Sequence, residues 1–168
     1  MKTTTAMVLF WGTREIYSNW HPSTFTVQGV TYPHVEQYMM AAKARLFGDT
    51  AVEKAILAAT DPKKIKALGR DVKGYIDAQW VAVREQVVFE ACLAKFTQNP
   101  TLTQQLLATG DRRIVEASPV DAIWGIGLGQ DDPRAADPAK WQGLNLLGIV
   151  LMRVRATLRE QAESAPGI

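Results

Sequence analysis

The chain of 168 residues has little of several residue types that commonly mark a function. It has one cysteine, Cys92, so an intrachain disulfide is impossible and a cysteine-rich metal site is excluded. Its two histidines, His21 and His34, are too few for a zinc site built on imidazole. The formal net charge of +2 gives no bulk electrostatic argument for a nucleic-acid partner. We therefore expect neither a metal nor a cofactor.

Long apolar runs are also missing. The longest, from Leu144 to Met152, contains Asn145 and Gly148 and falls well short of the roughly 20 residues that a membrane span needs. The first seven residues contain one lysine and three threonines and lack the apolar core of a secretory signal. We expect no association with a membrane, and the cytosol is the default location.

The composition present, 47% hydrophobic and 21% charged, is typical of a globular protein. A chain of this length is expected to form a single domain over residues 1–168, with a core of about 7–160 that needs no disulfide. The apolar run Met7–Trp11 predicts a strand. Alternating polar and apolar residues over 24–27 and 30–32, around a Gln-Gly pair, predict a hairpin.

Capping residues divide most of the remainder into helices. Asp49, Asp61, Asp77 and Asn99 each precede a helical stretch as candidate N-caps, and Gly69 is expected to end the third helix. The predicted helices cover about 35–47, 50–59, 63–68, 77–96, 100–108 and 144–162, with a short strand at 114–115. The fold class predicted is therefore α+β, mostly α-helical, with a small antiparallel β element.

The stretch 121–140 carries three glycines and two prolines and predicts a long loop, a kind of segment that is often functional. Its start, Trp124–Gly129, alternates glycine with other residues, so the backbone N–H groups near Gly125 and Gly127 are candidates for contacting a phosphate. This is not the dinucleotide-binding fingerprint, which needs a following helix where this chain has prolines.

Glu36 and Lys43 are the first candidates for chemistry. Positions seven apart on a helix point in nearly the same direction, and Met39 and Met40 lie between them on a mostly apolar face. A carboxylate and an amine there are costly to bury unless they are paired or used. One interpretation is an acid/base carboxylate beside an amine that binds phosphate or acts as a nucleophile, and the other is a structural ion pair.

Trp80 and Trp124 are candidates for stacking on a planar base, although burial in the core is the alternative for both. Glu116 and Asp121 flank a Ser-Pro pair near the glycine-rich loop, where they suit ribose hydroxyls or an activated water. Asp121 equally suits the cap of a turn. The basic residues of the third helix (Lys63, Lys64, Lys66 and Arg70) form either a phosphate-facing patch or a solvated helix face.

Taken in order, these blocks resemble the YbiA-like or NADAR (NAD- and ADP-ribose-associated) family. The resemblance covers about residues 9 to 159, and the ordered set of blocks is specific. It is carried by Phe10–Gly12, Tyr17–Trp20, Gly29–Lys43, Trp80–Phe96, Val115–Pro119, Asp121, Trp124–Leu128, Asn145–Gly148 and Leu151–Met152.

The resemblance implies a YbiA-like fold and an N-glycosidase, a hydrolase of N-glycosyl bonds. Members of the family are associated with cleaving the base–ribose bond of phosphorylated aminopyrimidine intermediates of riboflavin biosynthesis, and others remove ADP-ribose from guanine. The implied partner is a small ribosyl phosphate or ADP-ribose, with ADP-ribosylated nucleic acid as a further carrier. A module that binds ADP-ribose or NAD without cleaving it is the alternative.

By position, Glu36 and Lys43 match the family's acid and lysine, and Trp80 and Trp124 match its site tryptophans. Ile126 stands where some members carry an aspartate, and we take Asp121 as the substitute. The expected catalytic residues are thus Glu36, Lys43 and Asp121. The expected substrate-binding residues are Asn19, Tyr38, Trp80, Glu116, Trp124, Gly125, Gly127 and Asn145.

Overall fold

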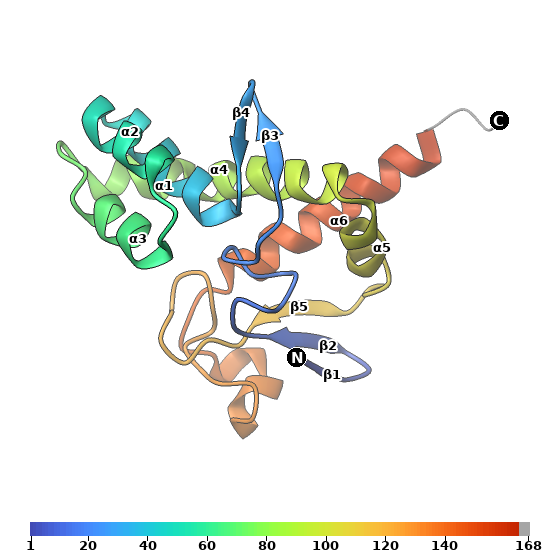
Figure 1. Cartoon of the computed structure of the whole chain (residues 1–168). Helices are drawn as coiled ribbons and strands as arrows, with labels where there is room; N and C mark the ends of the chain where they lie inside the picture. Colours follow the sequence, from blue (N-terminus) through green and yellow to red (C-terminus); the bar gives the residue numbers. More distant parts are fainter. Residues whose placement is uncertain (165–168) are drawn as a thin grey trace.

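Most of the chain is helical, as the sequence predicts, in a computed structural model that describes residues 1–164 (Figure 1). The helices are α1 (Val35–Leu46), α2 (Thr50–Ala58), α3 (Pro62–Arg70), α4 (Asp77–Gln98), α5 (Pro100–Leu107) and α6 (Leu146–Ser164). The strands are β1 (Lys2–Thr3), β2 (Met7–Phe10), β3 (Phe25–Val27), β4 (Val30–Tyr32) and β5 (Arg113–Glu116), and two short 3₁₀ turns, Pro133–Ala136 and Pro138–Lys140, lie in the long loop.

The strands form two separate sheets. The predicted hairpin is confirmed as the antiparallel pair β3–β4. The other sheet has the order β1-β2-β5, and β2 and β5 run parallel, with Met7 opposite Arg113 and Phe10 opposite Glu116. This parallel pair was not predicted, because the two strands are about a hundred residues apart in sequence. It brings the carboxyl ends of both strands to one edge.

The three-stranded sheet separates two apolar cores, because alternate side chains of a strand point to opposite faces. Val8, Phe10 and Ile114 belong to the large core under the helices. Met7 and Leu9 belong to a small core with residues of the 126–141 loop. Figure 1 shows helices α4 and α6 on one side of the sheet and the 3₁₀ turns on the other.

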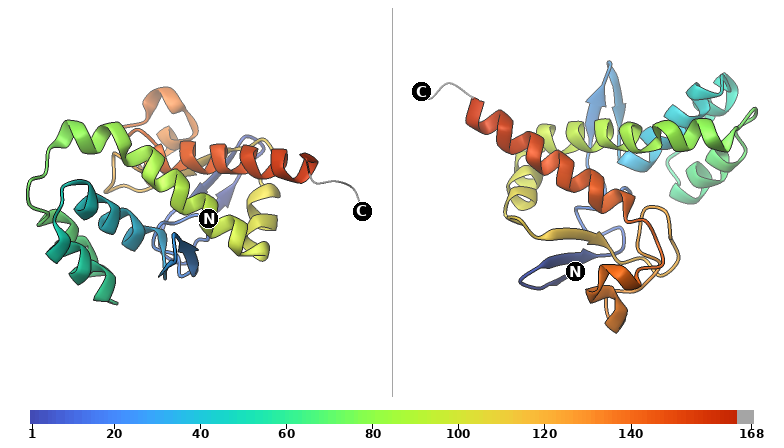
Figure 2. Two further views of the ribbon diagram at one scale, coloured as in Figure 1. Left: turned by 90° about the horizontal axis from the view of Figure 1, so that it is seen from above. Right: turned by 180° about the vertical axis from the view of Figure 1, so that it is seen from behind.

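Helix α4 organises the helical layer. Helices α1, α2 and α3 gather around its N-terminal half, and α5 lies at its C-terminal end (Figure 1). Helix α6 crosses α4 and also packs on β5 (Figure 2). Within residues 1–164, no helix combines the length and the apolar character needed to cross a membrane.

The predicted helix ends are partly confirmed. Asp49 and Asp61 cap α2 and α3 by accepting backbone N–H groups at 3.1 Å and 3.0 Å. Asp77 is instead the first residue of α4, and the residue before it caps nothing with its side chain. Asn99 makes no side-chain cap, because its amide donates to the carbonyls of Thr24 and Lys95.

Helix α3 continues through Gly69 to Arg70 rather than ending at the glycine. Gly69 lies against Met40 of α1, whose thioether occupies the space that a Cβ would need. The glycine therefore serves helix–helix packing and does not act as a helix stop.

Gly148 allows the first turn of α6 to lie directly on β5. A Cβ at this position would overlap the carbonyl oxygen of Ile114 and the side-chain amide of Asn145. In an open helix, alanine would stabilise relative to glycine by about 0.5–1 kcal/mol. Here the backbone carbonyl cannot move aside without disturbing the strand.

We therefore predict that Gly148→Ala lowers the free energy of unfolding by about 1–3 kcal/mol or more, as overpacking does in a close-packed interior. The matched control is Gly129→Ala, where a Cβ meets nothing within 4 Å and the expected change is within about 0.5 kcal/mol. Urea denaturation of both variants measures the difference. Equal stabilities would show that α6 can withdraw from β5 at little cost.

Candidate active site

A cleft of about 240 Å³ opens at the carboxyl ends of the parallel strands β2 and β5. Its walls come from the segment after β2, the segment after β5 and helix α3. The lining residues are Trp11, Gly12, Thr13, Ser18, Trp20, Lys66, Glu116, Ser118, Val120 and Asp121. The ends of parallel strands are a common place for ligand sites, because loops from both strands converge there.

Two carboxyl groups line this cleft, and a third lies close enough to act on them. Glu116 and Asp121 are the lining residues. Glu36, buried in the first turn of α1, is not among the lining residues, but its charge acts on Glu116. Burial raises the pKa of Glu36 to about 7, with Asp121 raising it further and Lys66 and Lys43 opposing the rise. Burial also raises the pKa of Glu116 to about 8, and the charges of Asp121 and Glu36 add to the effect. Two carboxyls therefore titrate close to neutral pH.

Within residues 1–164, neither of the two carboxyls with a raised pKa is paired with a hydrogen-bond donor or a cation. The side chain of Glu36 forms no hydrogen bond or ion pair with the described part of the chain, and Glu116 Oε2 is buried without a hydrogen-bond partner there. A buried acceptor without a donor costs about 1–3 kcal/mol, so such groups in a folded protein call for an explanation. A ligand that brings hydroxyl or amino donors would satisfy them.

Glu36 is held by the start of α1. His34 caps this helix, because its Nδ1 accepts the backbone N–H of Gln37 at 3.1 Å. Burial lowers the pKa of His34, with help from the charge of Lys95, and this favours the neutral ring that the cap requires. The backbone N–H of Glu36 donates to the carbonyl of Asn19 at 2.9 Å. The carboxyl is thus fixed to both the helix and the loop after β2.

Glu116 is held by Asn145. The amide oxygen of Asn145 accepts the backbone N–H of Glu116, and its amide nitrogen donates to the carbonyl of Ile114, both at 3.0 Å. Asn145 is buried and has a φ of 53°, a left-handed conformation that asparagine tolerates better than most residues. Its side chain therefore acts as a strand partner for β5, and it lies outside the set that lines the cleft.

Asp121 has both of the roles considered for it. Its Oδ1 accepts the backbone N–H groups of Ile123 and Trp124 at 2.8 Å and 2.9 Å, which is a turn cap, and the residue also lines the cleft. Gly125 is needed in this turn because a Cβ would lie 2.8 Å from the carbonyl oxygens of Asp121 and Glu116. Gly127 has a φ of 68°. Both glycines shape the loop, and neither lines the cleft.

Lys43 lies at the edge of this arrangement. Its Nζ donates to the carbonyl of Gly69 at 2.7 Å and lies 4.5 Å from the centre of the Tyr75 ring. It forms no ion pair with Glu36 in the described residues, although its charge reaches that carboxyl. Burial lowers the pKa of Lys43. The lysine that lines the cleft is Lys66 of α3, from the basic helix that the sequence left undecided.

The tryptophans that line the cleft differ from those expected. Trp80 is buried in the large core, and Trp124 is half-buried and packs against that core. Trp11 and Trp20 line the cleft instead. The sequence placed Trp11 at the end of a strand and in the first block of the family resemblance, but gave it no role in the site. Its position at the cleft follows from the parallel pairing of β2 and β5.

Two further expected residues lie near or beneath the site. Tyr38 is buried against Phe25 and Tyr32, and its hydroxyl donates to Glu90 at 3.2 Å, so it supports the fold. Asn19 is buried with its Oδ1 unpartnered in the described chain, while its backbone holds Glu36. The unused amide oxygen is a second acceptor beside the loop that lines the cleft.

Sequence reasoning missed Lys95. It lies inside the apolar stripe of α4 and is 1% exposed, with Nζ donating to the carbonyls of Ile16 and Ser18 at 2.6 Å and 3.0 Å. Burial lowers its pKa to about 8. Lys95 fastens the loop after β2 to the core. A lone lysine within an apolar helix face was the signal that could have indicated this role.

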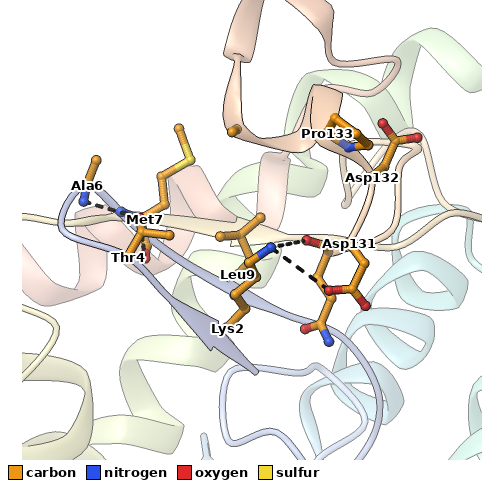
Figure 3. Close-up of a pocket in the computed structure, with 10 residues that line it drawn as sticks. Lys2, Thr4, Ala6, Met7, Leu9, Asp131, Asp132 and Pro133 are labelled. Carbon is orange, nitrogen blue, oxygen red and sulfur yellow. Dashed lines mark hydrogen bonds and ion pairs between the residues drawn. The ribbon is translucent and has the colours of Figure 1, made fainter.

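A second cavity, of about 310 Å³, lies on the opposite face of the sheet (Figure 3). Met7 and Leu9 of β2 contribute apolar side chains to it, and Lys2 lies 4.0 Å from Asp131 at its rim. Its lining includes neither Glu36 nor Glu116, the two carboxyls with raised pKa values. We regard the cleft at the strand ends as the candidate active site.

The residues present offer neither a metal centre nor a reactive thiol. No group of three or more His, Cys, Asp or Glu side chains within residues 1–164 is arranged to hold a metal ion. Cys92 is buried, and burial raises the pKa of its thiol to about 12, so the thiolate nucleophile is disfavoured. The charged side chains that line the cleft are Lys66, Glu116 and Asp121.

Comparison with known proteins agrees with the resemblance noted in the sequence. The NADAR domain model matches residues 9–159. N-glycosidase R617 of Acanthamoeba polyphaga mimivirus is 44% identical over 145 residues, which cover 83% of this chain and 85% of that protein. Riboflavin biosynthesis protein VVA0006 of Vibrio vulnificus is 34% identical over 86% of this chain, although the match covers only 36% of that longer protein.

The fold has a counterpart among solved structures. The NMR structure of the Escherichia coli protein YbiA superimposes with a TM-score of 0.81 and is 29% identical in sequence. The alignment covers 99% of this chain and 92% of that one. The mostly helical α+β architecture is thereby confirmed independently of the helix and strand pattern.

The raised carboxyl pKa values predict an unusual pH dependence of stability. Glu36 and Glu116 ordinarily titrate near 4.5, and in the folded protein near 7 and 8, so the folded state binds more protons between these values. The free energy of unfolding should therefore fall as the pH rises from about 5 to 8, by at most about 6 kcal/mol for the two groups together.

Glu116→Gln should remove much of this fall and be more stable than the wild type at about pH 8, as measured by urea denaturation across the pH range. Glu160→Gln, at an exposed position of α6, is the control and should follow the wild-type curve. A Glu116→Gln curve parallel to the wild type would mean that Glu116 is not protonated at neutral pH.

Proposed function

The chain belongs to the NADAR domain family, and from this premise we propose that it is an N-glycosidase, a hydrolase that cleaves the bond between a base and a phosphorylated ribose. The observation that carries the proposal is the pair Glu36 and Glu116, two carboxyls with raised pKa values. Glu116 lines the cleft together with Lys66, and the charge of the buried Glu36 acts on Glu116. Enzymes that break glycosidic bonds commonly use two carboxyl groups, one protonated and one ionised.

The charge changes of the reaction suit one protonated and one ionised carboxyl. Breaking an N-glycosidic bond develops positive charge on the sugar and negative charge on the departing base. Near neutral pH Glu116 retains its proton, because burial raises its pKa to about 8 and the charges of Asp121 and Glu36 add to the effect. We assign the ionised role to Glu36, whose pKa is the lower, and the proton donor role to Glu116.

In the direct route a water molecule attacks C1′ of the ribose. The bond from the water oxygen to C1′ forms as the C1′–N bond breaks, Glu36 takes the proton of the water, and Glu116 gives its proton to the base. Asp121 keeps the pKa of Glu116 high by its charge. Proton exchange with solvent returns both carboxyls to their starting states.

Lys43 and Lys66 supply positive charge near the carboxyls. Lys66 lines the cleft and suits a phosphate or the ribose that carries it. Lys43 has two candidate roles, a second phosphate anchor or a nucleophile. As a nucleophile, its neutral amine would attack C1′ and displace the base, and the opened sugar would remain as an imine until water released it. The lowered pKa of Lys43 favours this neutral form.

The substrate class is supported by the family and by two buried acceptors, one on a residue that lines the cleft and one beside it. Phosphorylated ribosyl aminopyrimidines of riboflavin biosynthesis and ADP-ribosyl guanine both present ribose hydroxyls and amino groups, the donors that Glu116 Oε2 and Asn19 Oδ1 lack. The name of the Vibrio relative favours the first kind of substrate. The alternative function is a module that binds ADP-ribose or NAD and leaves it intact.

The decisive experiment incubates the protein with a panel of these N-glycosides and detects released base and sugar by mass spectrometry. We expect the wild type to release base and Glu36→Gln to lower turnover by at least about 100-fold, the usual contribution of a general acid or base. Glu160→Gln should retain full turnover. Ligand-induced melting shifts without any released base would instead support the binding module.

The role of Lys43 is tested by Lys43→Ala and by borohydride added during turnover. We expect Lys43→Ala to lower turnover by at least about 100-fold, as loss of a group that acts at the reacting centre does. A reduced sugar adduct on Lys43, found by peptide mass mapping, would establish the imine. Rescue by Lys43→Arg without an adduct would assign phosphate binding, and near-wild-type Lys43→Ala would remove the residue from the mechanism.

A further inference from the structure

Two large apolar side chains are left exposed at the mouth of the cleft. Trp11 is 52% exposed and Val120 is 84% exposed, and both line the cleft together with Glu116 and Asp121. Single exposed apolar residues are ordinary, but an indole and a branched side chain that face one cavity indicate a binding surface. Neither residue belongs to the proposed acid–base pair.

The position of Trp11 relative to the acid is set by strand register. Phe10 pairs with Glu116, and the backbone N–H of Ala117 donates to the carbonyl of Phe10 at 2.8 Å. Trp11 is thus the first residue beyond the ladder, and it lines the cleft together with Glu116, the carboxyl proposed to protonate the base. Gly12, with a φ of 101°, turns the chain away immediately afterwards.

Trp20 provides the second indole of the cleft. Trp20 is half-buried and lines the same cleft, with its ring 5.4 Å from the His34 ring at 48°. His34 caps the helix of Glu36, so this wall is built on the same helix start as the carboxyl. Val120 also lines the cleft, and its backbone N–H donates to Ser118 Oγ at 3.4 Å.

On the premise of the proposed function, we infer that Trp11, Val120 and Trp20 form the subsite for the planar base of the substrate. Indole faces stack on any aromatic base, whereas the charged wall with Lys66 suits the ribose phosphate. The base then lies beside Glu116, which protonates it. Because Trp11 and Val120 stand at the rim, their size determines which bases, one ring or two, are accepted.

The test compares Trp11→Ala, Trp11→Phe and wild type on two substrates with the same ribose phosphate, one with an aminopyrimidine and one with guanine. Loss of one stacking contact of about 1–3 kcal/mol predicts that Trp11→Ala raises KM by about 5- to 100-fold and leaves kcat within about 3-fold. Trp11→Phe should restore most of the loss. Val120→Trp should penalise guanine more than the aminopyrimidine.

A binding experiment tests the base subsite independently of whether the protein cleaves the substrate. Titration of wild-type protein with free guanine, free aminopyrimidine and ribose 5-phosphate should show weaker binding of the bases to Trp11→Ala and unchanged binding of the sugar phosphate. Val81→Ala, at a position on α4 that is 44% exposed and outside the cleft, is the control. Base release is measured separately on the wild type.

Trp11→Ala behaving like Val81→Ala in both arms would overturn the inference, even if the wild type releases base. Base binding that depends on Trp11, without release of base by the wild type, would uphold the subsite and refute the N-glycosidase. If Trp11→Ala weakened the binding of the bases and of the sugar phosphate equally, the indole would maintain the shape of the whole cleft rather than contact the base. That result would also overturn the inference.

Discussion

The parallel pairing of β2 with β5 is the constraint on which the active-site cleft depends. It joins residues 7–10 to residues 113–116, so closing the ladder brings together the two ends of a segment that contains α1 to α5. A parallel pair needs such a crossover, and non-local pairs of this kind form late because the loop entropy must be overcome first. The ladder then sets Trp11 beside Glu116 and separates the two apolar cores.

The free edge of β5 shows how the site is kept in register without another strand. The side chain of Asn145 and the backbone N–H of Ile126 satisfy the outward-facing groups of Ile114 and Glu116. This close approach is possible because Gly148 has no Cβ. Such an arrangement fixes the backbone of Glu116 and leaves its carboxyl free. The residue expected to bind substrate, Asn145, is thus better understood as the one that positions the acid.

The local features of the fold were predictable from sequence, whereas the site was only partly so. The hairpin, the caps Asp49 and Asp61 and most helix boundaries depend on neighbouring residues, which a sequence displays directly. The parallel pairing depends on chain segments about a hundred residues apart. For that reason Trp11 was read as an ordinary strand end, while Trp80, which has the same chemistry, is packed in the core.

Glu36 illustrates what a helical pattern can and cannot establish. The spacing indicated that Glu36 shares a mostly apolar face of α1 with Lys43. The positive charge with the larger effect on the pKa of Glu36 is nevertheless that of Lys66, on another helix, and the charge of Lys43 contributes less. Likewise, the position of Lys95 on the apolar face of α4 could indicate a buried lysine, but not that its partners would be the carbonyls of Ile16 and Ser18. Charges act through space, so their partners follow tertiary packing rather than sequence separation.

The cleft concentrates groups whose burial costs stability. Glu36 and Glu116 are held where ionisation is unfavourable. Among residues 1–164, Glu116 Oε2 and Asn19 Oδ1 find no donor, and the buried Lys95 meets carbonyls rather than a carboxylate. A protein selected for stability alone would replace these groups with apolar side chains, as buried charges often can be. Their presence together at the ends of two strands is what a site for proton transfer requires. The large core under α4 and α6 supplies the stability that offsets them.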